Sequence, residues 1–200
     1  MIDNYFRKFL QPRVSLIIGF YQKLGLTPNI LTVIGVLIGA LAAGLCALNV
    51  GASVVVLVWW VSRFLDGTDG ILARATGQTS DFGAYLDITG DMLTYSLMIL
   101  GFMVRYPQLQ LVWSWILLLY VLCITTALAL GSGLDQKKIK NTDNRGLRLA
   151  NGLAEGGETG LAYTVFLLLP EFIEVSAMIW TCILVVTISA RTLLAYRVLR

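Results

Sequence analysis

Long apolar stretches, separated by short breaks of glycine, proline and polar residues, dominate the chain from residue 29 onward. Each is about 20 residues or longer, the length that an α-helix needs to cross a bilayer. None alternates apolar and polar residues with a period of two, so transmembrane β-strands are not expected. The pattern predicts an all-α polytopic membrane protein. We expect six transmembrane helices, over residues 29–48, 52–75, 81–105, 109–133, 151–169 and 175–197.

The first 24 residues have a different pattern, in which basic residues alternate with phenylalanine, leucine and isoleucine. This pattern is typical of an amphipathic helix that lies on the membrane surface. No cleavable signal is expected, because no charge-free apolar run is followed by a small-residue cleavage site. Gly25 and Pro28 then break the helix. We therefore divide the chain into a juxtamembrane helix, residues 1–24, and a six-span domain, residues 25–200.

Lysine and arginine residues are distributed unevenly between the two ends of the predicted spans. Four precede the first span, five lie between the fourth and fifth, and two follow the sixth, whereas Arg105 is the one at the opposite ends. An excess of basic residues marks the cytoplasmic side of membrane proteins. We expect a multi-pass protein of the cell (inner) membrane with both termini in the cytoplasm.

The composition supports this assignment and excludes several kinds of chemistry. Hydrophobic residues make up 57% of the chain and charged residues 14%, against about 25% charged residues in soluble domains. The chain has no histidine, which excludes histidine-based acid–base catalysis and histidine metal sites. Cys46, Cys123 and Cys182 are far apart in apolar runs, so we expect neither disulfides nor a zinc site.

The second and third predicted spans contain an unusual number of charges. Each costs about 2.5–3.5 kcal/mol near the middle of a membrane, so such residues usually have a function. A salt-bridged helix pair, for instance through Arg74 and Asp81, is the simpler alternative. Two basic residues cannot neutralise five acidic ones, however, and helix pairs associate without carboxylates. The seven charged residues are Arg63, Asp66, Asp69, Arg74, Asp81, Asp87 and Asp91.

The spacing of four aspartates predicts that they converge. Asp66 and Asp69 are three residues apart and Asp87 and Asp91 four apart, so each pair shares a helix face. The turn between the two helices is centred near Gln78, and folding about it brings the pairs level. An all-oxygen cage of four carboxylates suits Mg²⁺ or Mn²⁺, and four carboxylates suit two ions. Two such cations indicate a phosphate substrate, and they can neutralise a pyrophosphate.

Glycines on the turn side of this cage leave space for a ligand. At Gly70 and Gly83 the missing side chains would admit a flat base or a phosphate, although glycine is also common in membrane helices for packing reasons. Arg74, one turn beyond Gly70, can hydrogen-bond a phosphate.

Residues 66–91 resemble the signature of the CDP-alcohol phosphotransferases, D-x-x-D-G-x-x-A-R, eight residues, G-x-x-x-D-x-x-x-D. Every fixed position matches. The resemblance implies an enzyme of phospholipid biosynthesis that transfers a substituted phosphate from a CDP-linked lipid, such as CDP-diacylglycerol, to an alcohol and releases CMP. It implies that Asp91 also takes the acceptor proton. The implied metal ligands are Asp66, Asp69, Asp87 and Asp91, and the implied CDP-binding residues are Gly70, Ala73, Arg74 and Gly83, with Ser80, Asn29 and Thr32 as weaker contributors.

The same resemblance sets the expected cofactors and partners. They are Mg²⁺ or Mn²⁺ as two ions, a CDP-linked lipid, a small alcohol acceptor and the surrounding membrane lipid. A homodimer is implied by the resemblance alone, and no nucleic-acid partner is expected. The active site should open to the cytoplasm, because the turn near Gln78 lies on the basic side.

The acceptor alcohol stays open. Basic residues between the fourth and fifth spans are explained either by the topology or by a phosphate on the acceptor. Glu155 and Glu158 either stabilise a helix N-terminus or bind the acceptor. In phosphatidylinositol-phosphate synthases a comparable stretch resembles G-x-x-E-R-x-E-R, but Gly156 and Thr159 replace its arginines here. The candidate acceptor residues are Arg191, Arg148, Arg145, Lys138, Glu155 and Glu158.

Two other functional classes explain part of the pattern. A cation channel or transporter explains the aspartates, but not Gly70, Ala73, Arg74 and Gly83 at their spacings. A prenyl-diphosphate enzyme also uses aspartates, but Asp66 and Asp69 lack the adjacent acid of its D-D-x-x-D motif. Protection by a cytidine nucleotide distinguishes the transferase from both.

Overall fold

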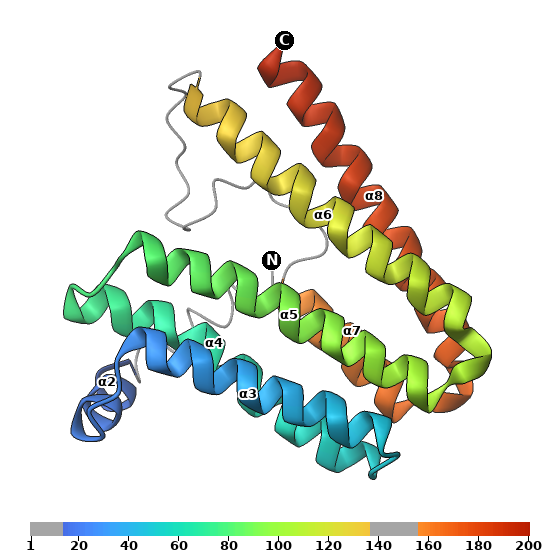
Figure 1. Cartoon of the computed structure of the whole chain (residues 1–200), viewed down its shortest axis with the longest axis horizontal. Helices are drawn as coiled ribbons and strands as arrows, with labels where there is room; N and C mark the ends of the chain where they lie inside the picture. The colour runs from blue at the N-terminus through green and yellow to red at the C-terminus, as the bar shows by residue number, and fades with distance from the viewer. Residues whose placement is uncertain (1–13, 137–155) are drawn as a thin grey trace.

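The computed structural model describes residues 14–136 and 156–200 of the chain. These residues form seven α-helices and two 3₁₀ turns (Figure 1). The helices are α2 (Val14–Lys23), α3 (Pro28–Ala47), α4 (Ala52–Thr76), α5 (Asp81–Arg105), α6 (Gln110–Gln136), α7 (Gly156–Leu168) and α8 (Ile173–Leu199). The turns are η2 (Pro107–Leu109), before α6, and η3 (Pro170–Phe172), before α8.

Local signals determine where the helices around the site begin and end. Thr27 caps the start of α3, with Pro28 at the first helical position, where its missing N–H costs nothing. Gly77 ends α4 with φ of +68°, and its N–H donates to the carbonyl of Ala73. That left-handed conformation favours glycine. Ser80 then caps α5 by accepting a 3.0 Å hydrogen bond from the N–H of Gly83.

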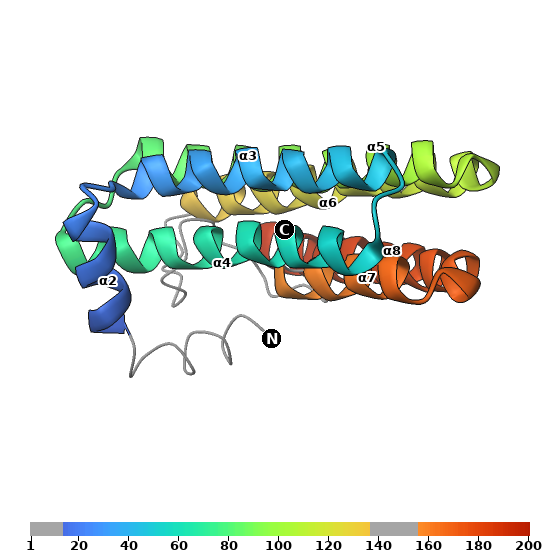
Figure 2. The same cartoon turned by 90° about the horizontal axis from the view of Figure 1, so that it is seen from below.

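The long helices lie in two layers, as Figure 2 shows, with α3, α5 and α6 in one layer and α4, α7 and α8 in the other. Helix α2 crosses one end of this bundle. Tyr21 is buried on its inner face and shares a 2.9 Å hydrogen bond with Thr68 of α4. Leu16 and Phe20 are exposed on the same helix, and Leu24 is exposed directly after it. Residues 14–23 of the predicted surface helix are therefore helical, with a buried and an exposed face. Its position on the membrane surface stays a prediction, and residues 1–13 of it lie outside the described residues.

Small residues let α3 pack closely on α4 and α5. A Cβ atom added at Gly35 would lie 3.5 Å from the carbonyl oxygen of Ser62, and one at Gly90 would lie 2.7 Å from Val36. Farther along, the bundle is filled by aromatic residues, among them Trp59, Phe102, Trp113, Tyr163 and Phe166. This packing fixes α3 against the helix pair that carries the aspartates.

Four helical segments among the described residues are long and apolar enough to cross a membrane: Pro28–Ala47, Asp81–Arg105, Pro107–Asp135 and Pro170–Leu199. The all-α class and the polytopic membrane architecture are therefore confirmed. Helix α4 is long enough, but it carries Arg63, Asp66, Asp69 and Arg74, which lower its hydropathy. Of the fifth predicted span, residues 151–169, only Gly156–Leu168 is described as helix, as α7. The count of six spans stays a prediction.

Candidate active site

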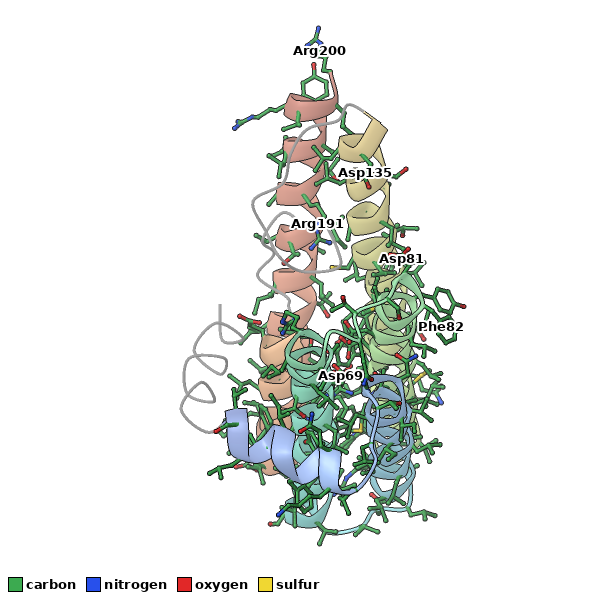
Figure 3. All side chains as sticks on the ribbon, turned by 90° about the vertical axis from the view of Figure 1, so that its left-hand side faces the viewer. Asp69, Asp81, Phe82, Asp135, Arg191 and Arg200 are labelled. Atoms are coloured by element: carbon green, nitrogen blue, oxygen red, sulfur yellow. The ribbon has the colours of Figure 1, made fainter. Side chains whose placement is uncertain are left out.

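Three of the four predicted metal ligands come together between α4 and α5. Carboxylate oxygens of Asp66, Asp69 and Asp87 all lie within 4.8 Å of one another. Asp69 is buried, Asp66 is half-buried and Asp87 is exposed. The group therefore extends from the interior of the bundle to its surface. Asp69, labelled in Figure 3, is its interior member.

Asp69 is held in place by the neighbouring helix. Thr32 of α3 donates a hydrogen bond from Oγ1 to Oδ2 of Asp69 over 2.5 Å. Both side chains are buried, with 6% and 4% of their surface exposed. Thr32, which the resemblance places among the CDP-binding residues, thus contacts a carboxylate of the three-aspartate group.

Asp91 faces Arg63 of α4. Its Oδ1 lies 2.5 Å from Nη1 of Arg63, and Oδ2 of Asp66 lies 3.5 Å from the same nitrogen. Nη1 also donates to the hydroxyl of Tyr95 over 3.2 Å. Asp91 is thus linked to the three-aspartate group through Arg63 and Asp66. Sequence reasoning assigned no partner to Arg63, although its spacing of three residues from Asp66 was a usable signal.

The donor set fits a hard divalent cation. Every ligand atom that the three-aspartate group offers is a carboxylate oxygen, the type that Mg²⁺ and Mn²⁺ prefer. Arg63 is a cation that the structure places against two of the four carboxylates, those of Asp66 and Asp91. A divalent cation would add further positive charge beside the converging carboxylates.

Most of the predicted CDP-binding residues flank the turn end of the site. A Cβ atom added at Gly70 would lie 3.3 Å from Nη1 of Arg74, so the Arg74 side chain lies back over that glycine. A Cβ atom at Gly83 would lie 3.2 Å from both Oδ1 of Asn29 and Oγ of Ser80. Ala73, on α4, is half-buried. Three helices thus present backbone and polar side chains at this end.

The predicted acceptor residues are described only in part. Arg191 is 6% exposed and donates from Nη1 to the carbonyl oxygen of Cys123 on α6 over 2.6 Å. Its Nε is buried without a hydrogen-bond partner in the part of the chain that the structure describes. Figure 3 shows Arg191 directed from α8 toward α6. Glu158 lies in the first turn of α7, half-buried. Lys138, Arg145, Arg148 and Glu155 lie outside the described residues.

The first turn of α7 lies next to the residues of the aspartate site. A Cβ atom added at Gly156 would lie 3.0 Å from the hydroxyl of Tyr95, the same hydroxyl that accepts from Arg63. The segment that carries Glu158 therefore begins beside the residues that contact Asp91.

Comparison with known proteins agrees with the signature on α4 and α5. The family model for CDP-alcohol phosphatidyltransferase matches residues 25–188. The chain is 33% identical to the inner membrane protein YnjF of Escherichia coli over 177 residues, which cover 86% of this chain and 84% of that protein. It is 44% identical to the archaetidylinositol phosphate synthase of Pyrococcus horikoshii over 79 residues, which cover 40% of this chain and 42% of that enzyme.

Solved structures share the fold. The phosphatidylinositol phosphate synthase of Mycobacterium tuberculosis, crystallised with CDP-DAG bound, superposes with a TM-score of 0.69 at 18% identity, over 92% of this chain and 93% of that chain. A second structure of the same protein, in complex with manganese and citrate, superposes with a TM-score of 0.65 at 18% identity, over 92% of this chain and 88% of that chain.

Proposed function

The chain belongs to the CDP-alcohol phosphatidyltransferase family, and from that premise we propose that it transfers the phosphatidyl group of CDP-diacylglycerol to the hydroxyl of a small polar alcohol and releases CMP. The observation that carries this proposal is the group formed by Asp66, Asp69 and Asp87, with Asp91 beside it. Family membership favours this enzyme over a cation channel or transporter with the same carboxylates.

Asp66, Asp69 and Asp87 would hold Mg²⁺ or Mn²⁺, and with Asp91 they offer enough oxygens for two ions. When bound, such ions neutralise a pyrophosphate and stabilise the charge that develops when its bond to the transferred phosphoryl group breaks. Thr32 orients Asp69 through its hydrogen bond. The manganese in the mycobacterial relative supports the choice of cation.

The turn end of the site would bind the cytidine diphosphate. Arg74 offers a forked cationic donor suited to a phosphate. Gly70 and Gly83 keep the two helices free of side chains there, and Ala73, with its small side chain, leaves further space. Asn29, Thr32 and Ser80 add polar groups from the starts of α3 and α5.

Asp91 would accept the proton of the acceptor hydroxyl. It lies four residues beyond Asp87, on the side of the site where α7 begins. A hydroxyl between Asp91 and the transferred phosphorus would lose its proton to the carboxylate as the new P–O bond forms and CMP leaves.

The acceptor would bind between Asp91, the first turn of α7 and α8. Arg191 and Glu158 would contribute from the described helices, together with Lys138, Arg145, Arg148 and Glu155. A buried arginine with a donor free among the described residues supports a phosphorylated acceptor, whereas Gly156 and Thr159 in place of arginines argue against an inositol phosphate. The acceptor is therefore proposed only as a small polar alcohol.

The membrane arrangement extends the same proposal. We propose that α4 and α7 are also spans, which gives six, and that the termini and the α4–α5 turn face the cytoplasm. In this arrangement the aspartates of α4 lie near its cytoplasmic end, which lowers the cost of their charges. We further propose a homodimer, which rests on family resemblance.

The test is a transferase assay with purified protein, radiolabelled CDP-diacylglycerol and a panel of phosphorylated and neutral alcohols. We expect CMP and one lipid product, identified by mass, only with the right acceptor and with Mg²⁺ or Mn²⁺. EDTA and Asp69→Asn should each abolish turnover, and a cytidine nucleotide should raise the melting temperature. Unchanged turnover in EDTA would overturn the metal assignment, and no CMP with any acceptor would overturn the proposed reaction.

A further inference from the structure

Arg63 is an arginine buried inside the bundle, and the structure surrounds it with specific partners. Only 8% of its surface is exposed. Its guanidinium carbon lies 4.9 Å from the ring centre of Trp59 and 5.1 Å from that of Tyr95. Nη2 donates to Oγ of Ser62 over 3.1 Å. The side chain is thus held between two aromatic rings, a geometry that the planar guanidinium favours and an ammonium does not reproduce.

The other terminal nitrogen of Arg63, Nη1, contacts two carboxylates of the site. Nη1 lies 2.5 Å from Asp91 and 3.5 Å from Asp66. Asp66 belongs at the same time to the three-aspartate group, whose oxygens lie within 4.8 Å of one another. The Asp66 carboxylate therefore lies beside both the guanidinium of Arg63 and the candidate cation position.

A fixed positive charge beside a cation site has a consequence for that site. It stabilises the carboxylates when no cation is bound, because like charges at close range repel one another. It also opposes the arrival of a second positive charge at the same carboxylates.

We propose that Arg63 is a positioning residue that acts as an internal counter-charge. It competes with the divalent cation for Asp66 and Asp91, and it holds the Asp91 side chain in place. The inference rests on the proposed function for the presence of a cation. On this proposal, Arg63 lowers the affinity of the site for the divalent cation and also fixes the position of Asp91.

The test measures Mn²⁺ binding by the full-length protein in detergent, from the electron paramagnetic resonance signal of free Mn²⁺, for Arg63→Gln and Arg63→Lys. Arg63→Gln removes the charge and should bind Mn²⁺ about fivefold more tightly or better, the lower end of the usual coupling between two sites. Arg63→Lys keeps the charge without the planar geometry, so its Mn²⁺ affinity should lie closer to that of the unmodified protein than to that of Arg63→Gln. Without cation, Arg63→Gln should melt at a lower temperature, and its melting temperature should rise more on addition of Mn²⁺.

Arg105→Gln is the matched control. Arg105 is the last residue of α5, at the end opposite the site, and donates to the carbonyl oxygen of Val50 over 3.0 Å. Its loss should lower the melting temperature and leave Mn²⁺ affinity unchanged. The same result for Arg63→Gln would mean that Arg63 is merely structural, and weaker Mn²⁺ binding by Arg63→Gln would also overturn the proposal.

A second measurement needs no change at Arg63. Because Trp59 packs on the guanidinium, competition for Asp91 and Asp66 should change its environment when Mg²⁺ binds. We expect a tryptophan fluorescence change on Mg²⁺ addition that is lost in Trp59→Phe. This measurement still tests the proposal if Arg63→Gln fails to fold. If the unmodified protein binds Mg²⁺ without the fluorescence change, the proposal is overturned. If the unmodified protein binds neither cation, the proposed function fails as well, whereas binding with equal affinities in Arg63→Gln would overturn this inference alone.

Discussion

Thr32 and Asp69 join α3 to the candidate active site through a 2.5 Å hydrogen bond from Oγ1 to Oδ2. Both side chains are buried, so the hydrogen bond is made in the interior of the bundle. Helix α3 therefore does more than fill the bundle: it supplies the donor that fixes one carboxylate of the three-aspartate group. Groups that orient metal ligands in this way commonly change metal affinity by about 10–100-fold when they are lost.

Thr32→Val should weaken Mn²⁺ binding by about tenfold or more, because it keeps the shape of the side chain and removes the donor. The measurement is an Mn²⁺ titration of the purified protein. Thr94→Val is the control: its hydroxyl is also buried and bonds to the carbonyl of Gly90 within its own helix, as that of Thr32 also does to Pro28. Equal Mn²⁺ affinities in the two variants would contradict a role for Thr32 in orienting Asp69.

Gly39→Ala should destabilise the bundle, whereas Gly44→Ala on the same helix should not. A Cβ atom at Gly39 would overlap the methyl group of Thr94 and lie 2.9 Å from Oγ of Ser62, so α4 and α5 would have to move. At Gly44 nothing lies within 4 Å. Overpacking of this kind costs about 1–3 kcal/mol. Melting curves of both variants in the same detergent check the prediction, and equal melting temperatures would contradict the close packing of α3.

Much of the site could be predicted from local spacing, because a helix fixes which residues share a face. Asp66 and Asp69 converge with Asp87 as the offsets about Gln78 predict, and the helix from 81 to 105 has the predicted bounds. Asp91 is the informative case. Its offset from Asp87 places it on the same face, but its partner Arg63 is 28 residues away. Arg63 is held by Trp59, one turn earlier on α4, and by the tertiary contact with Tyr95 of α5.

The number of spans shows a second limit of the sequence. Helix α4 carries the charges of the site, so the feature that indicates function also lowers the hydropathy by which a span is recognised. Thr32 shows a third limit. Its hydroxyl reaches Asp69 only because the small residues of α3 bring that helix close to α4, and no periodicity in the sequence encodes that contact.

Asp87→Asn and Asp91→Asn should both be nearly inactive, but for different reasons. Asp87 is one of the three converging carboxylates, so its neutralisation should weaken Mn²⁺ and CDP-diacylglycerol binding together. Asp91 faces Arg63, so Asp91→Asn should still bind CDP-diacylglycerol while its rate falls by about 10²–10⁴, the usual contribution of a positioned base. Thermal shifts with CDP-diacylglycerol and Mg²⁺ report the binding. Equal loss of binding in both variants would show that Asp91 is mainly a metal ligand.

A cysteine at Gln78 should react with membrane-impermeant thiol reagents only from the cytoplasmic side. Gln78 is exposed in the turn between α4 and α5, and the proposed topology, which rests on the distribution of basic residues, has this turn in the cytoplasm. Each test cysteine is introduced into a variant in which Cys46, Cys123 and Cys182 have been replaced. Gln108→Cys is the matched control, because Gln108 is exposed in η2 at the other end of α5 and should react only from outside. Labelling of Gln78→Cys in sealed cells would contradict the topology.

Arg191→Lys should separate two kinds of acceptor. Arg191 is buried on α8, where its Nη1 donates to the carbonyl of Cys123 and its Nε has no partner within residues 14–136 and 156–200. A charge in a span needs a reason, and an arginine binds phosphate through two parallel hydrogen bonds that lysine cannot reproduce. If the acceptor carries a phosphate, Arg191→Lys should raise its KM by about tenfold or more, the usual effect of losing a charged hydrogen bond, and leave CDP-diacylglycerol binding unchanged.

If the acceptor is a neutral polyol or an amino alcohol, Arg191 acts instead as a brace between α8 and α6, through Cys123. Arg191→Lys and Arg191→Ala should then lower the melting temperature and reduce activity with every acceptor alike. Arg197→Lys, a change at an exposed position on the same helix, should alter neither KM nor stability and serves as the control. The measurements are KM for each substrate and a melting curve for each variant. Normal KM values together with normal stability in both Arg191 variants would remove Arg191 from the site, and with it the best structural argument for a phosphorylated acceptor.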